Sequence, residues 1–261
     1  IRILGKGKNG ARALTQEEAY QAMRMIMAGE VLPEQLGAFL MLLRIKEETP
    51  EELAGMVLAA REACQLTPLT GQVDLDWATY AGKRRHLPWF ILSALLLAEH
   101  GIKILMHGVP GPASSRLYTQ AALRHLGLAP AESAEDAANQ ISRLNFSYLS
   151  LEKICPRLND IIELRPILGL RSPVHTLVRL LNPCNALFSL QGIFHPSYRA
   201  VHQHAAALLQ QPHMAVLKGE GGETERNPDV DCLVQSVHDG ALSEEVWPAL
   251  FTQRHVKSEG L

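Results

Sequence analysis

The sequence predicts an α/β protein in which a small N-terminal helical domain leads into a larger α/β domain with a mostly parallel central sheet. Three amphipathic helical patterns fill residues 1–65. After a Pro- and Gly-containing linker at residues 66–72, the pattern changes to short β-like runs that alternate with helices. This alternation is typical of a parallel sheet with helices on both faces. A chain of 261 residues is long enough for two unequal domains.

The first predicted helix has clear start and packing signals. Thr15 can cap it, and Glu18, three residues later, completes a capping box. Ala19, Met23 and Met27 then recur along one face of the helix. The pattern therefore predicts an amphipathic helix that buries this face.

Two further helices follow. Pro33 suits the first turn of the second helix, and Thr49, Pro50 and Glu52 provide a cap, a first-turn proline and a capping-box acid for the third. Three short helices bury little surface alone, so we expect them to pack on later helices or on a second subunit.

The remaining elements are predicted from short apolar runs and caps. Strand candidates lie at residues 73–75, 102–106, 146–149, 188–193, 214–217 and 232–237, and helices at 88–100, 115–126 and from 133 onward. The longest apolar run, residues 87–98, is too short to span a bilayer and is expected to form a buried helix.

Composition excludes some classes of protein. The formal net charge of -2 argues against a globally basic nucleic-acid binder, so local basic blocks matter more. The four cysteines form no Cys-x-x-Cys pair, which gives no support for a zinc site or a disulfide framework. Together with the lack of a signal peptide or a spanning segment, this favours a reducing cytoplasm and no membrane partner.

Four loops could meet where strands end, since ligands of open α/β sheets bind at the carboxyl ends of the strands. They cover residues 80–85, 107–115, 165–171 and 218–225. The first is basic, and the serines of the second could receive a phosphate at a helix N-terminus. The fourth combines glycines with carboxylates, which Mg²⁺ prefers. These loops suit a phosphorylated ligand.

At these loops the chain resembles the anthranilate phosphoribosyltransferases, or glycosyltransferase family 3, and the related pyrimidine nucleoside phosphorylases. The resemblance is carried by "GEVLPEQLGAFLMLLRIKEETPEELAGM", "LRPILGLRSPVHTLVRLLNP" and "LQGIFHP". It implies a nucleoside phosphorylase/phosphoribosyltransferase-type fold and a homodimer formed through a helical domain at 1–65, completed by later helices such as 156–182. The α/β domain would cover 73–261 and stop short of the family's usual C-terminus. The implied reaction is attack of an aromatic amine on Mg²⁺-bound phosphoribosyl pyrophosphate.

The chain departs from the family at its phosphate and metal motifs. The family's Gly-Thr-Gly-Gly-Asp loop aligns with residues 78–82, where one glycine remains before a basic block. The Lys-His-Gly-Asn-Arg loop keeps only its histidine and glycine, and the Asp-Glu metal pair falls at Thr224 and Glu225. The candidates for phosphate or substrate binding are Gly82, Lys83, Arg84, His107, Gly108, Ser114, Ser115 and Arg165, with Glu225 as the candidate Mg²⁺ ligand.

Three functions remain open from the sequence. The first is a phosphoribosyltransferase-like enzyme whose standard anthranilate reaction is altered or lost. The second is a non-catalytic scaffold that binds single- or double-stranded nucleic acid with little sequence preference, through Lys6, Lys8, Arg12, Lys83, Arg84 and Arg85. The third is a structural relative that binds a phosphorylated metabolite or a protein.

Overall fold

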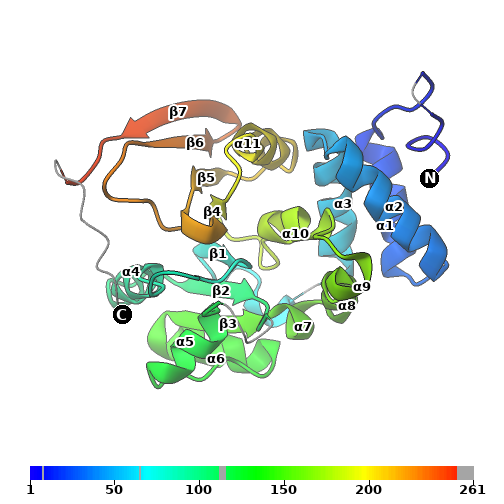
Figure 1. Ribbon diagram of the computed structural model, residues 1–261. Helices are drawn as coiled ribbons and strands as arrows, with labels where there is room; N and C mark the ends of the chain where they lie inside the picture. The colour runs from blue at the N-terminus through cyan, green and yellow to red at the C-terminus, as the bar shows by residue number, and fades with distance from the viewer. Residues whose placement is uncertain (8, 65, 112–115, 252–261) are drawn as a thin grey trace.

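The structure, a computed structural model, describes residues 1–7, 9–64, 66–111 and 116–251. Its N-terminal part contains α1 (Gln16–Met27), α2 (Pro33–Lys46) and α3 (Pro50–Ala63), as the sequence predicts. Both predicted capping boxes form: Thr15 with Glu18, and Thr49 with Glu52. These helices stand beside the α/β part of the molecule (Figure 1).

The helical part is held together by one close crossing and one buried carboxylate. A Cβ on Gly55 of α3 would overlap the backbone carbonyl of Gln16, so α1 and α3 approach closely only because this residue is glycine. Glu52, fully buried, accepts hydrogen bonds from the Leu14 amide at 2.8 Å and from Lys46 Nζ at 2.6 Å. These two hydrogen bonds attach Leu14, which precedes α1, and Lys46, at the end of α2, to α3.

Within the described residues, seven strands form one sheet in the order β3-β2-β1-β4-β5-β6-β7. The strands are β1 (Leu75–Thr79), β2 (Ile104–Gly108), β3 (Phe146–Ser150), β4 (Phe188–Ile193), β5 (His213–Lys218), β6 (Cys232–His238) and β7 (Ala241–Trp247). The five strands from β3 to β5 in this order are parallel, and β6 and β7 add an antiparallel hairpin at the edge. The mostly parallel sheet is confirmed, whereas β7 is absent from the sequence-based prediction. Its residues are exposed along most of the strand, so it lacks an apolar signal.

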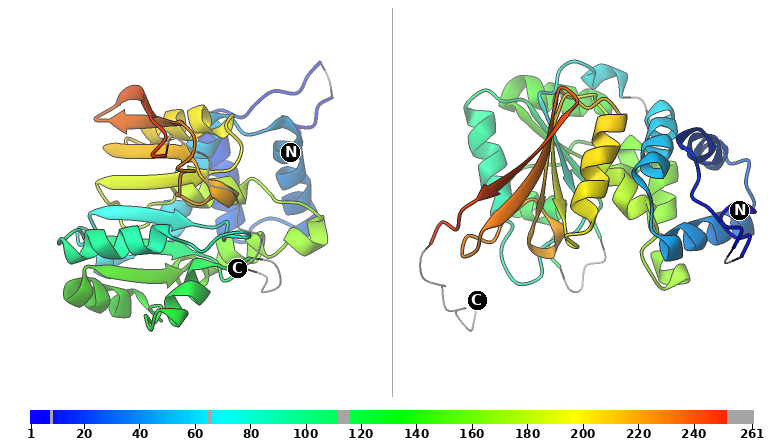
Figure 2. Two further views of the ribbon diagram at one scale, coloured as in Figure 1. Left: turned by 60° about the vertical axis from the view of Figure 1, so that its left-hand side comes forward. Right: turned by 90° about the horizontal axis from the view of Figure 1, so that it is seen from above.

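Helices cover both faces of the sheet (Figure 2). They are α4 (Phe90–Glu99), α5 (Thr119–His125), α6 (Ala134–Leu144), α7 (Leu151–Ile154), α8 (Pro156–Ile162), α9 (Arg165–Leu168), α10 (Val174–Leu177) and α11 (Tyr198–Leu208), with 3-10 turns at Thr67–Leu69, Val178–Leu180 and Glu220–Gly222. Helices α4 and α5 pack on Trp77, Met106 and Tyr148 of one face, and α6 and α11 belong to the core of the other.

The expectation of a buried helix at residues 87–98 is only half right. The inward face of α4 is buried, but Leu92 and Leu96 are 47% and 57% exposed. These leucines are exposed because α4 packs on the sheet through one face only, and they lie on the opposite face. In the described part of the chain, no helix combines the length and apolar character needed to cross a bilayer.

Arg61 connects α3 to the α/β part. Its guanidinium donates to the carbonyl oxygens of Leu180 and Leu181, at 3.0 and 2.7 Å. Cys64 at the end of α3 also pairs with Cys155, between α7 and α8, in a disulfide with a Cα–Cα distance of 5.1 Å. The expectation of no disulfide is wrong here, because 91 residues separate the two cysteines and only the fold brings them together. Cys184 and Cys232 are free and buried.

We expect reduction of the Cys64–Cys155 disulfide to lower the free energy of unfolding. A crosslink across a long loop restricts the unfolded chain, and the typical contribution is about 2–4 kcal/mol. Denaturant unfolding with and without a reductant measures the loss. Cys184→Ser should leave the effect of the reductant unchanged, whereas Cys64→Ser should abolish it. An equal response to the reductant in both variants would contradict the pairing.

Candidate phosphate-binding site

The candidate site is formed by the loops after β1, β2 and β5 and by residues 165–171, which line a cavity with the first two loops. The loop after β1 is the one predicted from the sequence to correspond to a phosphate loop. Its backbone amides of Ala81 and Gly82 both donate to Oε1 of Glu223, at 2.7 and 2.6 Å. Glu223 is fully buried. The amides that could cradle a phosphate are therefore already bonded to a carboxylate of the same chain.

Glu223 is held in a tightly packed position. A Cβ on Gly219 would overlap the Glu223 carbonyl oxygen, and a Cβ on Gly192 would overlap the backbone between Glu223 and Thr224. Burial raises the pKa of Glu223, while the Arg179 guanidinium and the two amide hydrogen bonds oppose this rise. The close packing of the loop after β5 and these polar partners therefore hold the Glu223 carboxylate in one position.

Lys83 and Glu225, predicted as phosphate and metal ligands, pair with each other. Lys83 Nζ lies 2.7 Å from Glu225 Oε1 and 3.0 Å from Glu220 Oε2, and Lys83 is only 2% exposed. The other oxygen of Glu225 accepts from the amide of Phe90 at 3.1 Å. In this conformation Lys83 is not free for phosphate or nucleic acid, and Glu225 is not free for a metal. Arg84, in the same loop, is exposed.

The predicted His107 lies inside the sheet rather than in a cleft. It is fully buried, with Nδ1 2.7 Å from the Tyr80 hydroxyl and Nε2 3.0 Å from Asp76 Oδ1. A Cβ on the predicted Gly108 would overlap the carbonyl oxygen of Thr79, so this glycine serves the close pairing of β1 and β2. Both residues therefore contribute to the packing of β1 and β2 and are not placed to contact a phosphorylated ligand.

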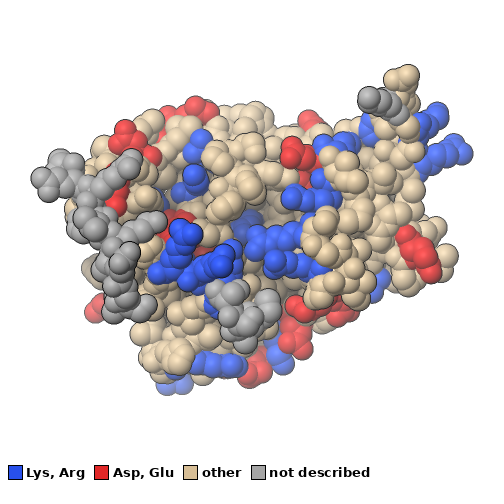
Figure 3. Space-filling model, in the orientation of Figure 1, with Lys and Arg blue, Asp and Glu red and all other residues tan. Residues whose placement is uncertain are grey.

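A cavity lined by arginines lies beside the loop after β1. The cavity has a volume of about 830 Å³, and its charged lining residues are Arg116, Arg165, Arg171, Glu152 and Glu163. The side chains of Arg165 and Arg171 form no hydrogen bond or ion pair with any described residue. Figure 3 shows basic side chains concentrated in the central hollow of this face. Burial and the neighbouring guanidiniums lower the pKa of Arg171. Such unbalanced positive charge favours an anionic ligand.

The structure does not unite all of the predicted basic residues. Lys6 and Arg12 belong to the N-terminal segment, which lies against the helical part (Figure 1), and Arg12 forms an ion pair with Glu18 at 2.6 Å. Arg85 is exposed in the loop after β1. The predicted Lys8, Ser114 and Ser115 lie outside the described residues.

Sequence reasoning missed the roles of Arg116, Arg179 and Glu223. Arg116 Nη1 donates to the carbonyls of Ala81 and Gly82 at 3.1 and 3.2 Å, so the loop is held from both sides. In the sequence, Arg179 is a single charged residue within an apolar segment. This pattern indicates a buried charge with a specific role. Nothing near Glu223 distinguishes it from the other glutamates of its loop.

We expect His175, which lines the cavity, to make stability pH-dependent. Burial, followed by the charge of Arg171, lowers its pKa from 6.5 to about 4. Between these values the unfolded chain binds more protons, so the free energy of unfolding should fall as pH drops from 6.5 to 4, by at most about 3 kcal/mol. His202, whose pKa burial lowers to about 3, acts in the same direction. Denaturant unfolding across this pH range should show a shallower fall for His175→Asn; an identical slope would contradict the assignment.

Comparisons with known proteins place this architecture in a class. Residues 1–64 match the family described as "Glycosyl transferase family, helical bundle domain". This match covers the helical part only; the α/β part, with its mostly parallel sheet, lies outside it. A solved structure of anthranilate phosphoribosyltransferase from Thermus thermophilus superposes with a TM-score of 0.77 at 30% identity, over 91% of this chain and 70% of the other.

Sequence relatives identify the family. The chain is 30% identical over 243 residues to an anthranilate phosphoribosyltransferase of Polynucleobacter necessarius, which covers 92% of this chain and 71% of the relative. It is 32% identical over 211 residues to that of Thermus thermophilus, covering 80% of this chain and 64% of the relative. The chain belongs to the anthranilate phosphoribosyltransferase family. A Saccharomyces cerevisiae member in complex with PRPP and Mg shares the fold at 17% identity, with a TM-score of 0.74 over 94% of this chain and 70% of the other.

Proposed function

We propose that this chain binds a phosphorylated small molecule in its arginine-lined cavity, and that the standard anthranilate reaction of the family is altered or lost. The observation that supports this most directly is the bonding of the Ala81 and Gly82 amides to Glu223. Release of pyrophosphate requires donors aimed at the charge that develops on the leaving group. In this loop those donors are satisfied by a buried carboxylate of the chain itself.

The predicted metal position also fits the standard reaction poorly. Mg²⁺ takes oxygen ligands, but both oxygens of Glu225 already accept hydrogen bonds, from Lys83 and from the Phe90 amide. We therefore derive no reaction step through Mg²⁺ and expect ligand binding that does not depend on it.

The arginines of the cavity are the groups that remain available to bind an anionic ligand. Arg165 and Arg171 lie on the cavity wall, their side chains without a partner among the described residues, and a guanidinium can form paired hydrogen bonds with two oxygens of a phosphate or carboxylate. A cavity of about 830 Å³ has room for a sugar phosphate. Arg165 would hold one anionic group of such a ligand.

Calorimetric titrations with phosphoribosyl pyrophosphate and with ribose 5-phosphate test this proposal, each with and without Mg²⁺. We expect saturable binding that is unchanged by Mg²⁺ and weakened about tenfold or more in Arg165→Gln, because one charge-assisted contact is lost. Arg2→Gln, a change of an exposed arginine in the N-terminal segment, is the matched control. Mg²⁺-dependent binding with turnover of anthranilate would contradict the loss of the standard reaction. No binding of either ligand would contradict the proposed ligand class.

Nucleic-acid binding is a second candidate, favoured by exposed groups beside the same hollow. Arg84 and Arg85 are exposed, and Trp89 is 56% exposed nearby in the chain and available for base stacking. The burial of Lys83 and the ion pair of Arg12 reduce the footprint that the sequence predicts. A homodimer formed through residues 1–65 would double these basic groups and add avidity.

Single-stranded DNA binding across a salt series tests this second candidate. If it is correct, affinity falls steeply with salt, and Arg84→Ala/Arg85→Ala weakens binding, because each lost phosphate contact also reduces the salt dependence. Unchanged DNA binding in this variant would exclude the loop as the contact surface. Sedimentation of the same protein tests the dimer.

A further inference from the structure

A second, smaller cavity lies between α2, α10 and the segment that connects β4 to α11. Its volume is about 120 Å³. We propose that this cavity is a separate binding site for a phosphate dianion, as free phosphate or as the terminal phosphate of a small metabolite, and that the bound anion connects the helical and α/β parts of the molecule.

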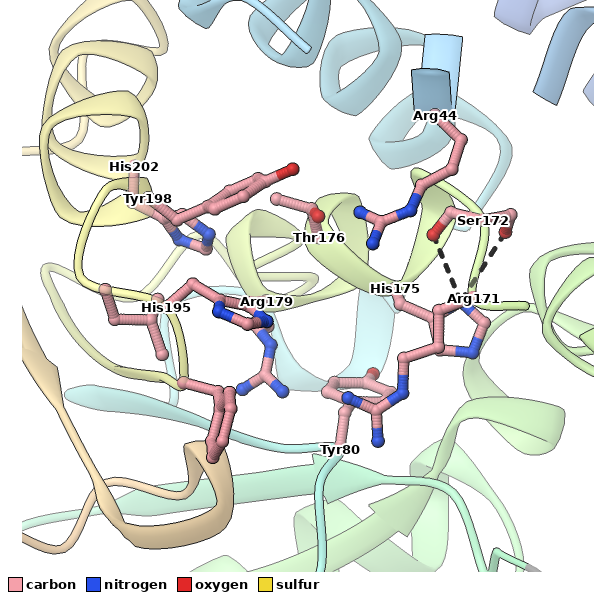
Figure 4. A pocket seen from close by; sticks show the side chains of 12 residues that line it. Arg44, Tyr80, Arg171, Ser172, His175, Thr176, Arg179, His195, Tyr198 and His202 are labelled. Atoms are coloured by element: carbon pink, nitrogen blue, oxygen red, sulfur yellow. Dashed lines mark hydrogen bonds between the residues drawn. The ribbon is translucent and has the colours of Figure 1, made fainter. Parts of the chain in front are cut away.

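Three guanidinium groups from different segments carry the argument. Arg44 comes from α2 of the helical part, Arg171 from the segment before α10, and Arg179 from the 3-10 turn after it. Figure 4 shows Arg44 reaching into the pocket from the helical part, with Arg171 and Arg179 on the opposite side of it, near Tyr80. The described residues that line the cavity include no aspartate or glutamate. The site therefore combines three positive charges with no carboxylate in its wall.

The donors of these arginines are largely unused. No hydrogen bond or ion pair links the side chain of Arg44 or Arg171 to any described residue. Arg179 is 8% exposed and donates through Nη1 to the carbonyl oxygens of Gly192 at 2.6 Å and Gly222 at 2.8 Å. Its Nε and Nη2 form no bond within the described chain. The backbone contacts hold this guanidinium in place and leave a pair of donors for a ligand.

Two carboxylates near the cavity offset part of this charge. Glu48 interacts electrostatically with Arg44 and accepts a hydrogen bond from the Tyr198 hydroxyl at 3.1 Å, and Glu223 interacts electrostatically with Arg179. The charged side chains that act on Arg171, by contrast, are the guanidiniums of Arg179, Arg165 and Arg116. Since this positive charge is not fully offset, an anion in the cavity would stabilise the arrangement.

The cavity has room for phosphate and offers neutral donors beside the guanidiniums. Its volume of about 120 Å³ is enough for one tetrahedral oxyanion. Thr176 and His195 add groups that can donate to its remaining oxygens. Phosphate offers four oxygens to these donors, whereas a carboxylate offers two.

This site differs from the larger cavity in a way that variants can separate. Arg44 lines only the smaller cavity and Arg165 only the larger, whereas Arg171 lines both. Arg44 is partly exposed and forms no hydrogen bond or ion pair with a described residue, so Arg44→Gln should fold normally. Arg44→Gln and Arg165→Gln are therefore a matched pair with the same chemical change in two different cavities.

The test is a calorimetric titration of the full chain with inorganic phosphate at constant ionic strength, with chloride as the reference anion. We expect saturable binding to the unsubstituted protein, a loss of about tenfold or more in Arg44→Gln, and less than about twofold change in Arg165→Gln. Circular dichroism confirms that both variants fold. No phosphate binding at millimolar concentration would overturn the proposal. So would a loss confined to Arg165→Gln, which would assign phosphate to the larger cavity and leave the proposed function standing.

Discussion

Glu223→Ala should give the loop after β1 a capacity to bind pyrophosphate that this loop lacks in the unsubstituted protein. The change removes the acceptor of the Ala81 and Gly82 amides and leaves space in place of the carboxylate. Two backbone donors to a charged group contribute about 1.5–3 kcal/mol each, so affinity should rise by at least about tenfold even after partial compensation by water. Calorimetric titration with pyrophosphate measures the gain.

Glu223→Gln is the matched control for this gain. The glutamine side chain has nearly the same shape and keeps an oxygen that can accept from both amides, so it should remain in place. We expect Glu223→Gln to bind pyrophosphate as poorly as the unsubstituted protein. If Glu223→Ala folds but gains no affinity, or if both variants gain equally, the amides are not the element that Glu223 occupies.

Gly55→Ala should cause the largest loss of stability expected from a single methyl group in the helical part. The added Cβ would overlap the Gln16 carbonyl, so α1 and α3 must move apart and lose packing in the core. Overpacking of this kind costs about 1–3 kcal/mol or more. Denaturant unfolding measures the change.

Gly37→Ala in α2 provides a control of opposite sign. A Cβ on Gly37 meets no atom within 4 Å, so alanine adds helix propensity without a clash. Stability should rise by about 0.5–1 kcal/mol. Equal effects of the two substitutions would mean that α1 and α3 do not cross as closely as the structure describes.

Local signals explain why much of the fold could be predicted. The capping boxes at Thr15 and Thr49 and the apolar stripes depend only on residues a few positions apart, so the helices of the N-terminal part follow from the sequence. The alternation of short strands and helices likewise predicts the parallel sheet. β7 escaped prediction because an exposed edge strand needs no apolar pattern, and its pairing with β6 is a tertiary contact.

The candidate site was harder to predict because its decisive contacts are long-range. Ala81 and Glu223 are 142 residues apart, as are Lys83 and Glu225. From the sequence Lys83 is one member of a basic block and Glu225 one of several loop carboxylates, so both look free to bind a ligand. The structure instead pairs them, because opposite charges on two facing loops satisfy each other when no ligand does. Arg165 does lie on the wall of a cavity.

The most direct test of the account is an NMR measurement of the Ala81 and Gly82 amides in the unsubstituted protein during titration with phosphoribosyl pyrophosphate and Mg²⁺. With Glu223 bonded to both amides, we expect their resonances and their slow hydrogen exchange to stay unchanged, while signals near Arg165 respond. Large shifts of both amides at saturation would show that the ligand displaces Glu223. That result would contradict a loop closed by its own carboxylate and would support the standard chemistry of the family.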